Sequence, residues 1–308
     1  MSSAVLISIA MTVVGAATPI LLAALGELVV EKSGVLNLGL EGMMLIGAVT
    51  AFAVTYSTGS APLGLIAAMA ASAAASMIFG FLTLTLTANQ VATGLALTIF
   101  GIGLSSLIGQ GFVGRTVDAL HRTFPAALAE HPVWRLIFGH SPLVYISLVM
   151  TALVAWFLTR SRAGLILRAI GESDEAAHSI GYSVIGVRYL AVAFGGAMAG
   201  LGGSYYSLVL TPMWADRLTA GRGWIALALV VFASWRPLRL LAGAYLFGAV
   251  MTFELHAKAA GVSFLAPEFL AMLPYLATIV VLTVISVAPA GGRLAAPACL
   301  GKPFRATG

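Results

Sequence analysis

Charged residues are scarce in this chain of 308 residues. Only 9% of them are Asp, Glu, Lys or Arg, whereas soluble domains contain about 25% of these types. Apolar residues make up 60% of the sequence. This composition excludes an ordinary soluble domain. We expect an all-α, polytopic membrane protein with a single transmembrane domain over residues 1–308 and a membrane core over 5–287.

Cysteine is almost absent as well. The single cysteine, Cys299, excludes an intrachain disulfide and a cysteine-based metal site. The five histidines lack metal-ligand spacing, and we assign no chemistry to His121, His131, His140, His178 and His256. We therefore expect no bound metal.

A phosphate-binding loop is also missing. The pattern Gly-x-x-x-x-Gly-Lys-Ser/Thr does not occur, and the only Gly-Lys pair is Gly301-Lys302. The chain lacks the usual means of binding ATP, so we expect no cofactor on it and an energy source on another chain. The net charge of +5 comes without a basic cluster interleaved with aromatics. Positive loops beside membrane spans explain the charge better than nucleic-acid binding.

Apolar windows of about 20 residues predict the membrane spans. We expect about nine spans, in a range of about 8–10, near 5–25, 38–57, 62–84, 91–109, 142–158, 188–209, 223–235, 240–258 and 269–287. Gly and Pro interrupt several windows, and the segment 26–42 is the best candidate for a broken or re-entrant element. The first apolar run has no basic region before it and no small-residue cleavage site after it. We expect it to be a retained span rather than a signal peptide.

The basic residues predict the topology. Placing the connection 159–187 in the cytoplasm puts ten of the 16 Lys and Arg residues inside and six outside. We therefore expect an outside N-terminus, an extracytoplasmic loop over 110–141 and a cytoplasmic tail over 288–308.

The densest polar stretch of the chain lies in the connection 159–187. Ser173 is suited to cap a helix N-terminus, and the acids Asp174 and Glu175 follow in the first turn, where the helix dipole favours them. Gly181 is suited to end the helix. The spacing predicts a two-turn helix over 174–180. On spacing alone, an amphipathic surface helix and a docking element for a partner are both possible.

Several blocks of the sequence resemble one family. Glu175-Ala176-Ala177-x-x-x-Gly181 resembles the conserved loop with which permeases of ATP-binding-cassette (ABC) importers dock on their ATPase. Other blocks resemble nucleoside-type permeases of the ribose and branched-chain amino-acid permease superfamily: Gly26–Met44, Ala88–Thr98, Arg168–Glu172, Val187–Ala191 and Thr219–Leu229. The resemblance runs in order from about residue 19 to residue 287.

This resemblance implies a type II-like importer permease fold in the bacterial inner (plasma) membrane, with a cytoplasmic coupling helix. It implies three protein partners: an ABC ATPase subunit that holds ATP and magnesium, a second permease in a heterodimer, and an extracytoplasmic lipoprotein that captures nucleosides. The predicted ATPase-coupling residues are Glu172, Ser173, Asp174, Glu175, Ala176, Ala177, Ile180 and Gly181. Movement of the helix 174–180 would rock the spans attached to it.

Polar residues within the apolar windows are candidates for the substrate path, because ionisable groups in a membrane usually face a cavity. A nucleoside needs hydrogen-bonding groups for its hydroxyls and base edge, and a flat apolar surface for stacking. The candidates are Asn37, Glu41, Asn89, Gln90 and Trp224. Interhelical hydrogen bonds for the amides and a membrane-interface position for the tryptophan are the competing interpretations.

Two further patterns favour structural roles. Glu27, Glu31 and Lys32 are spaced for a solvated ion pair at the inner face, which we favour over a proton relay. Gly196-x-x-x-Gly200 lets helices approach closely, and we favour packing within the chain over a heterodimer seam.

Three function classes are in play. The first is the permease subunit of an ABC importer, for nucleosides or alternatively for a simple sugar such as ribose. The second is an ion-coupled secondary transporter, with Glu41 and Glu254 as coupling carboxylates. The third, an intramembrane enzyme, lacks a pair of catalytic-type residues at a helical spacing. We expect a transporter subunit that is not itself an enzyme.

Overall fold

The computed structural model describes residues 3–120, 122–125, 132–259 and 296–305, and six single positions between 269 and 283. These residues form an all-helical protein, as predicted. Their only strand-like pairings are two isolated bridges, Val113–Trp214 and Thr116–Met213. Helices suit a membrane because each one satisfies its own backbone hydrogen bonds.

Seven described helices are long and apolar enough to cross a membrane. They are α1 (Ser3–Lys32), α2 (Leu40–Thr58), α3 (Ala61–Gly80), α4 (Gln90–Gly109), α6 (Pro142–Arg160), α9 (Val184–Tyr205) and α11 (Pro237–Ala259). Two π turns extend α3 and α9, η1 (Phe81–Thr85) and η4 (Tyr206–Leu210), and a 3-10 turn, η2 (Gln110–Phe112), follows α4.

The polytopic architecture is confirmed, but the predicted count of nine spans is not. The window 223–235 contains α10 (Arg222–Phe232), which has 11 residues. A helix of that length extends about 16 Å, against a hydrocarbon core of about 30 Å. The window 269–287 lies outside the described residues, apart from the six single positions.

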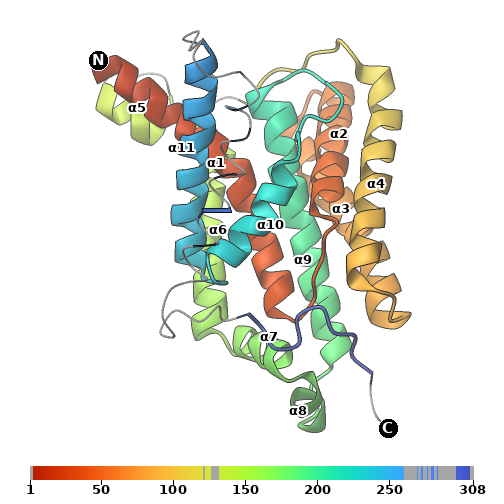
Figure 1. Ribbon diagram of the computed structural model, residues 1–308. Helices are drawn as coiled ribbons and strands as arrows, with labels where there is room; N and C mark the ends of the chain where they lie inside the picture. Colours follow the sequence, from red (N-terminus) through yellow and green to blue (C-terminus); the bar gives the residue numbers. More distant parts are fainter. Residues whose placement is uncertain are drawn as a thin grey trace.

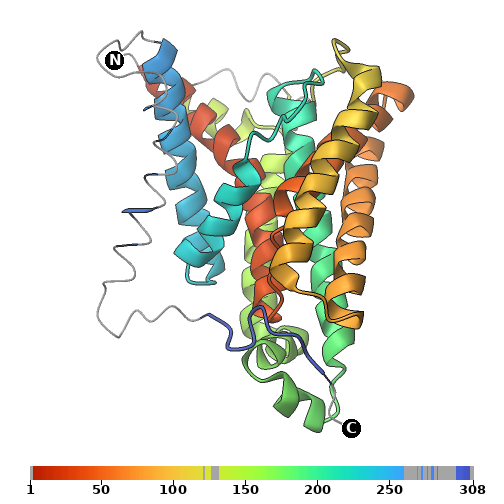
Figure 2. The same ribbon diagram turned by 45° about the vertical axis from the view of Figure 1, so that its right-hand side comes forward.

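α9 lies in the middle of the bundle and packs against α1, α2 and α3 (Figures 1 and 2). Small residues permit this close approach. A Cβ atom added to Gly200 would lie 2.8 Å from Oγ of Ser72 on α3, and one added to Gly47 of α2 would lie 2.5 Å from the Cα of Gly200. A Cβ atom added to Gly196 would likewise be too close to the side chain of Ser76 on α3. The Gly196-x-x-x-Gly200 pattern therefore packs helices within this chain, as predicted.

α4, α6 and α11 flank this centre (Figure 1). α4 packs on α2, whereas α6 and α11 pack on α1. Large apolar side chains on the flanking helices point outwards, and Ile99 and Leu107 of α4 are 71% and 66% exposed. An apolar surface of this extent suits a lipid environment.

The interruption predicted for 26–42 is present. α1 ends at Lys32, α2 begins at Leu40, and the backbone between them is not helical. Gly34 ends α1 with a φ of +90°, a conformation that glycine adopts without strain. We call residues 33–39 the α1–α2 turn.

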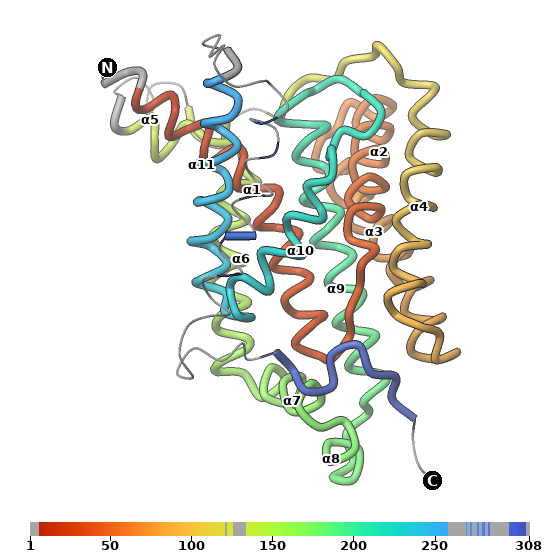
Figure 3. The backbone as a smooth tube through the Cα atoms, in the orientation of Figure 1, coloured from red at the N-terminus to blue at the C-terminus, as the bar shows by residue number. Residues whose placement is uncertain are grey.

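The two ends of the bundle differ (Figure 3). α7 (Arg162–Glu172), α8 (Asp174–Ser179) and residues 296–305 lie at one end, which we call the α8 end. α5 (Pro132–Phe138) and the start of α1 lie at the other end, the α5 end. At the α5 end, Phe124 packs edge-on against Phe138 and Tyr145, with ring centroids 5.0 Å and 5.5 Å apart.

Candidate functional site

α8 forms much as its sequence predicts. The hydroxyl oxygen of Ser173 accepts a hydrogen bond from the amide of Ala176 over 3.3 Å, which caps the helix. Gly181 has a φ of +93° and lies just after the helix. The helix ends at Ser179, one residue earlier than predicted, and Ile180 is its C-cap. The polar stretch is therefore a separate capped helix.

One face of α8 is buried. Ala177 is 2% exposed and packs with Ile170 of α7 and Val184 of α9. Ile180, by contrast, is 71% exposed. The other exposed members of the predicted coupling set are Glu172, Ser173, Glu175, Ala176 and Gly181. α8 thus holds to the bundle through one small contact and presents its remaining surface at the α8 end (Figure 1).

Arg188 of α9 anchors the start of α8. Its side chain is fully buried, and Nη2 donates to Oδ2 of Asp174 over 3.0 Å. Its Nε donates to the carbonyl oxygen of Ser33 in the α1–α2 turn, also over 3.0 Å. One guanidinium group therefore connects α8, α9 and the end of α1.

The sequence prediction included Arg188 only as part of the block Val187–Ala191 and missed this contact. The signal that points to it is the position of Arg188 at the start of the apolar window 188–209. A charge in such a window needs a partner, because an unpaired charge within the membrane is costly. The nearest acids in the sequence are those of α8.

Asn37 shapes the α1–α2 turn. It is fully buried, and its Oδ1 accepts a hydrogen bond from the amide of Gly39 over 2.9 Å. The backbone amide of Asn37 donates to Oε1 of Glu27 over 3.2 Å. These bonds give the turn a fixed conformation without helical hydrogen bonds.

Glu41 lies in the first turn of α2 and caps another helix. Its Oε1 accepts hydrogen bonds from the hydroxyl of Thr219 (2.5 Å) and the amide of Gly221 (2.8 Å), and its Oε2 accepts one from the amide of Gly223 (2.6 Å). The carboxylate is 5% exposed and sits at the N-terminus of α10, where the helix dipole favours a negative charge. Trp224, which is partly buried, follows Gly223 directly.

Asn89 and Gln90 lie at the start of α4. Oδ1 of Asn89 accepts a hydrogen bond from the amide of Ala92 over 3.0 Å and so caps α4. Oε1 of Gln90 accepts one from the amide of Leu36 over 2.8 Å, in the α1–α2 turn. The structure thus brings Gln90 to the turn that holds Asn37, and it brings Glu41 to Gly223, the residue before Trp224.

The expected solvated ion pair around Glu27, Glu31 and Lys32 is wrong for the two acids. Glu27 is fully buried and Glu31 is 2% exposed, because the end of α1 packs among α9, α10 and α11. Oε2 of Glu31 accepts a hydrogen bond from Nε1 of Trp235 over 2.5 Å. Within the described residues, no three His, Cys, Asp or Glu side chains are grouped to hold a metal ion.

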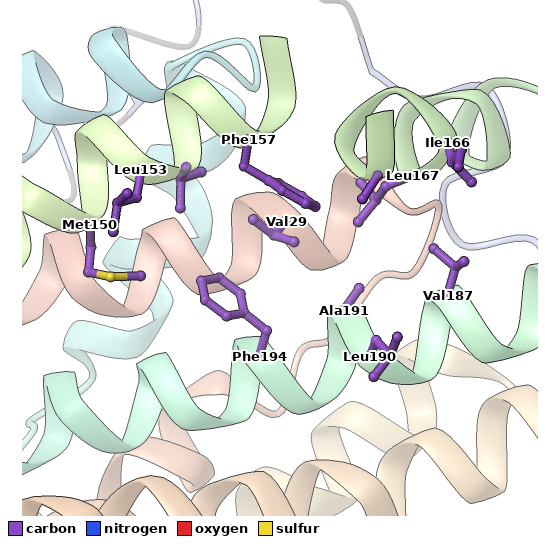
Figure 4. Close-up of a pocket in the computed structure, with 12 residues that line it drawn as sticks. Val29, Met150, Leu153, Phe157, Ile166, Leu167, Val187, Leu190, Ala191 and Phe194 are labelled. Carbon is purple, nitrogen blue, oxygen red and sulfur yellow. The ribbon is translucent and has the colours of Figure 1, made fainter. Parts of the chain in front are cut away.

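An apolar cavity of about 430 Å³ opens between α6, α7 and α9, with Val29 of α1 at its base (Figure 4). Phe157, Leu167 and Phe194 line it together with other apolar side chains. A lining without charged or hydroxyl side chains offers little to a cargo rich in hydroxyl groups, which needs placed donors and acceptors. We therefore place no cargo site there.

Known proteins resemble this chain over nearly its full length. The family model described as branched-chain amino acid transport system / permease component matches residues 9–285. The chain is 41% identical to a putative glucose ABC transporter permease protein of Haloferax volcanii, over 94% of this chain and 95% of that protein. No solved structure matches the chain.

Two further relatives carry nucleoside names. The guanosine ABC transporter permease protein of Bacillus subtilis is 33% identical, over 94% of this chain and 93% of that protein. The nucleoside ABC transporter permease protein of Lactococcus lactis is 27% identical, over 86% of this chain and 88% of that protein. The relatives share a role in ABC transport and differ in the cargo that their names give.

Proposed function

The chain belongs to the family of branched-chain amino acid transport system permease components, and from this premise we propose that it forms the path of an ATP-driven nucleoside importer and receives motion through α8. At the coarser level, it is a multi-pass permease subunit of an ABC importer of the nucleoside or sugar type. It is not itself an enzyme, since ATP hydrolysis in such importers takes place on a separate subunit.

The observation that carries the coupling role is the attachment of α8. This helix has one buried face and an accessible surface, and Arg188 joins its first residue, Asp174, to α9 and the α1–α2 turn. A partner that displaces α8 would therefore displace membrane-spanning helices with it. We assign the exposed members of the predicted coupling set to the ATPase contact: Glu172, Ser173, Glu175, Ala176, Ile180 and Gly181. The two other members, Asp174 and Ala177, hold α8 to the bundle instead.

The proposed orientation follows from the position of α8. If the ATPase binds at the α8 end, that end faces the cytoplasm and the α5 end faces outwards. α1 begins at the α5 end and residues 296–305 lie at the α8 end (Figure 1), which supports an outside N-terminus and a cytoplasmic C-terminus. A capture lipoprotein would then meet the α5 end, in a bacterial inner membrane, and a second permease would complete a heterodimer.

The nucleoside cargo is supported by the names of two relatives and by the surroundings of Trp224. Trp224 is partly buried and directly follows Gly223, whose amide binds Glu41, and an aromatic face can stack on a base. We propose Asn37, Glu41, Asn89, Gln90 and Trp224 as residues of the path. We favour Trp224 and Glu41 among them, because Glu41 binds the amide of the residue directly before Trp224.

A simple sugar is the second candidate cargo. It is favoured by the relative that is 41% identical and is named for glucose. Sugars also stack on aromatic rings, so Trp224 is compatible with both cargoes.

Transport by the complete complex tests this proposal. The permease would be reconstituted in liposomes with its partner permease, its ATPase and its capture protein. We expect ATP-dependent uptake of labelled guanosine, which unlabelled nucleosides suppress and glucose does not. If glucose suppressed the uptake and unlabelled nucleosides did not, a simple sugar would be favoured as the cargo. Accumulation driven by an ion gradient without an ATPase would overturn the coupling role.

A further inference from the structure

The last described segment of the chain, Ala296–Arg305, is used by none of the roles above, and we call it the strap. It crosses the α8 end beside α7 and the start of α9, in dark blue (Figures 1 and 2). The segment is folded rather than extended. The amide of Leu300 donates to the carbonyl of Pro297 and that of Lys302 to the carbonyl of Cys299, each over 3.0 Å.

Two backbone hydrogen bonds and one side-chain hydrogen bond tie the strap to three other parts of the protein. The amide of Cys299 donates to the carbonyl of Gly171 in α7 over 2.9 Å, and the amide of Gly301 donates to the carbonyl of Gly34 in the α1–α2 turn over 3.1 Å. Nε2 of Gln90 in α4 donates to the carbonyl of Lys302 over 3.5 Å. The strap thus links α7, the α1–α2 turn and α4, which are far apart in sequence.

Phe304 extends these contacts to α8. It packs against the cluster of Ile170, Ala177 and Val184, which is the same cluster that buries one face of α8. Its ring also meets the imidazole of His178 edge-on, with centroids 5.4 Å apart. Phe304 therefore covers the contact by which α8 is held to the bundle.

The strap fits tightly at the anchor of α8. A Cβ atom added to Gly34 would lie 3.3 Å from Cβ of Cys299 and 2.8 Å from Nη2 of Arg188. Cys299 is 8% exposed, and burial raises the pKa of its thiol. The strap is packed against the Arg188 anchor, and its only thiol is protected from solvent and kept neutral.

α8 needs such support because it is short. A helix of six residues is unstable by itself in water, and its only salt bridge in the described structure is the one to Arg188. Without Phe304, a displacement of α8 could be absorbed by local tilting. With the strap in place, α8, the α1–α2 turn and the start of α4 are connected through one packed segment.

We propose that the strap is a positioning element for ATPase coupling: it fastens α8 to the α1–α2 turn and to α4, so that displacement of α8 by the ATPase moves these segments together. Phe304 is its main positioning residue. This proposal rests on the proposed docking role of α8, and the two ideas fail in different experiments.

The first experiment asks whether Phe304 docks the strap. Cys299 is the only cysteine of the chain, so maleimide labelling of the assembled, unaltered complex reports on the strap when it is measured on the separated permease chain. We expect slow labelling in the wild type, and in Phe304→Ala labelling about tenfold faster, since losing a partly buried phenyl contact shifts the docking equilibrium by about that factor. Phe304→Leu should restore protection. Lys302→Ala, which removes only an exposed side chain, is the matched control. Fast labelling of the wild type would overturn the proposal.

The second experiment measures coupling. We expect Phe304→Ala and a chain ending at residue 295 to retain the ATPase subunit during purification and to hydrolyse ATP, but to move several times less cargo for each ATP. If both variants moved as much cargo for each ATP hydrolysed as the wild type does, the proposal would be overturned. If the wild-type permease itself retained no ATPase, the docking role of α8 would fail instead, whereas protection of Cys299 would still report on the strap.

Discussion

The guanidinium group of Arg188 and the carboxylate of Asp174 lie 3.0 Å apart, and they join α9 to the first residue of α8. The same arginine binds the carbonyl of Ser33 in the α1–α2 turn. Because Arg188 is fully buried, this pair is far less screened by solvent and salt than a surface ion pair. A force on α8 therefore reaches two membrane-spanning helices through one buried side chain.

Arg188→Ala should uncouple the transporter. The substitution leaves Asp174 without its ion partner and the carbonyl of Ser33 without its donor, and breaking a buried pair costs about 3–5 kcal/mol. We expect less cargo moved for each ATP hydrolysed in proteoliposomes, together with a lower Tm. Arg162→Ala, at an exposed position of α7, is the control and should behave as the wild type. A variant with normal coupling would contradict a transmitting role for Arg188.

Ser173→Ala should loosen α8 alone. Losing an N-cap of this type costs about 1 kcal/mol. In a helix of six residues, this raises the fraction of molecules in which α8 is unfolded about fivefold. Hydrogen exchange of the Ala176 amide, which donates to Ser173, measures the effect. Ser183→Ala removes the equivalent cap of the much longer α9 and should leave exchange in α8 unchanged. Equal exchange in both variants would mean that the cap does not hold α8.

Local signals in the sequence predicted α8 well, because its cap, first-turn acids and terminal glycine act on their own neighbours. The interruption after α1 was predictable for the same reason. Contacts across the bundle were not: Glu41 binds Gly221 at a separation of 180 residues, and no local pattern encodes that pairing. The burial of Glu27 and Glu31 was missed likewise, since it depends on α9, α10 and α11 packing around the end of α1.

His140 should make the α5 end sensitive to pH. Burial lowers the pKa of its imidazole below the ordinary value of 6.5, so the folded state favours the neutral ring. The stability that this gives is fully present above the unfolded pKa and is lost as the pH falls through the folded pKa. We expect hydrogen exchange in α5 to accelerate from about pH 7.5 to about pH 5 beyond the intrinsic effect of pH. His140→Gln should remove the dependence, and His256→Gln should keep it.

Glu41→Gln should destabilise the start of α10. Glutamine has one acceptor oxygen, whereas the glutamate accepts three hydrogen bonds from Thr219, Gly221 and Gly223. Leaving buried donors unpaired costs about 1–3 kcal/mol each, so we expect a lower Tm and reduced uptake. Thr219→Val, which removes one of the three donors, should give a smaller decrease in Tm. An unchanged Tm in Glu41→Gln would show that the cap does not stabilise α10.

Trp224→Ala separates a role in the path from a role in the fold. Stacking of a base on an aromatic side chain contributes about 1–3 kcal/mol. Loss of the indole should therefore raise the KM for guanosine about fivefold or more, as measured by guanosine uptake into liposomes that contain the complete complex. The Tm should decrease only modestly, because Trp224 is partly rather than fully buried. Trp156→Ala, on the outer surface of α6 with 59% of its side chain exposed, should leave the KM unchanged. Trp224→Phe keeps an aromatic face and should recover most of the affinity. If Trp224→Ala instead lowers the Tm strongly and leaves the KM unchanged, Trp224 supports α10 and the cargo stacks elsewhere.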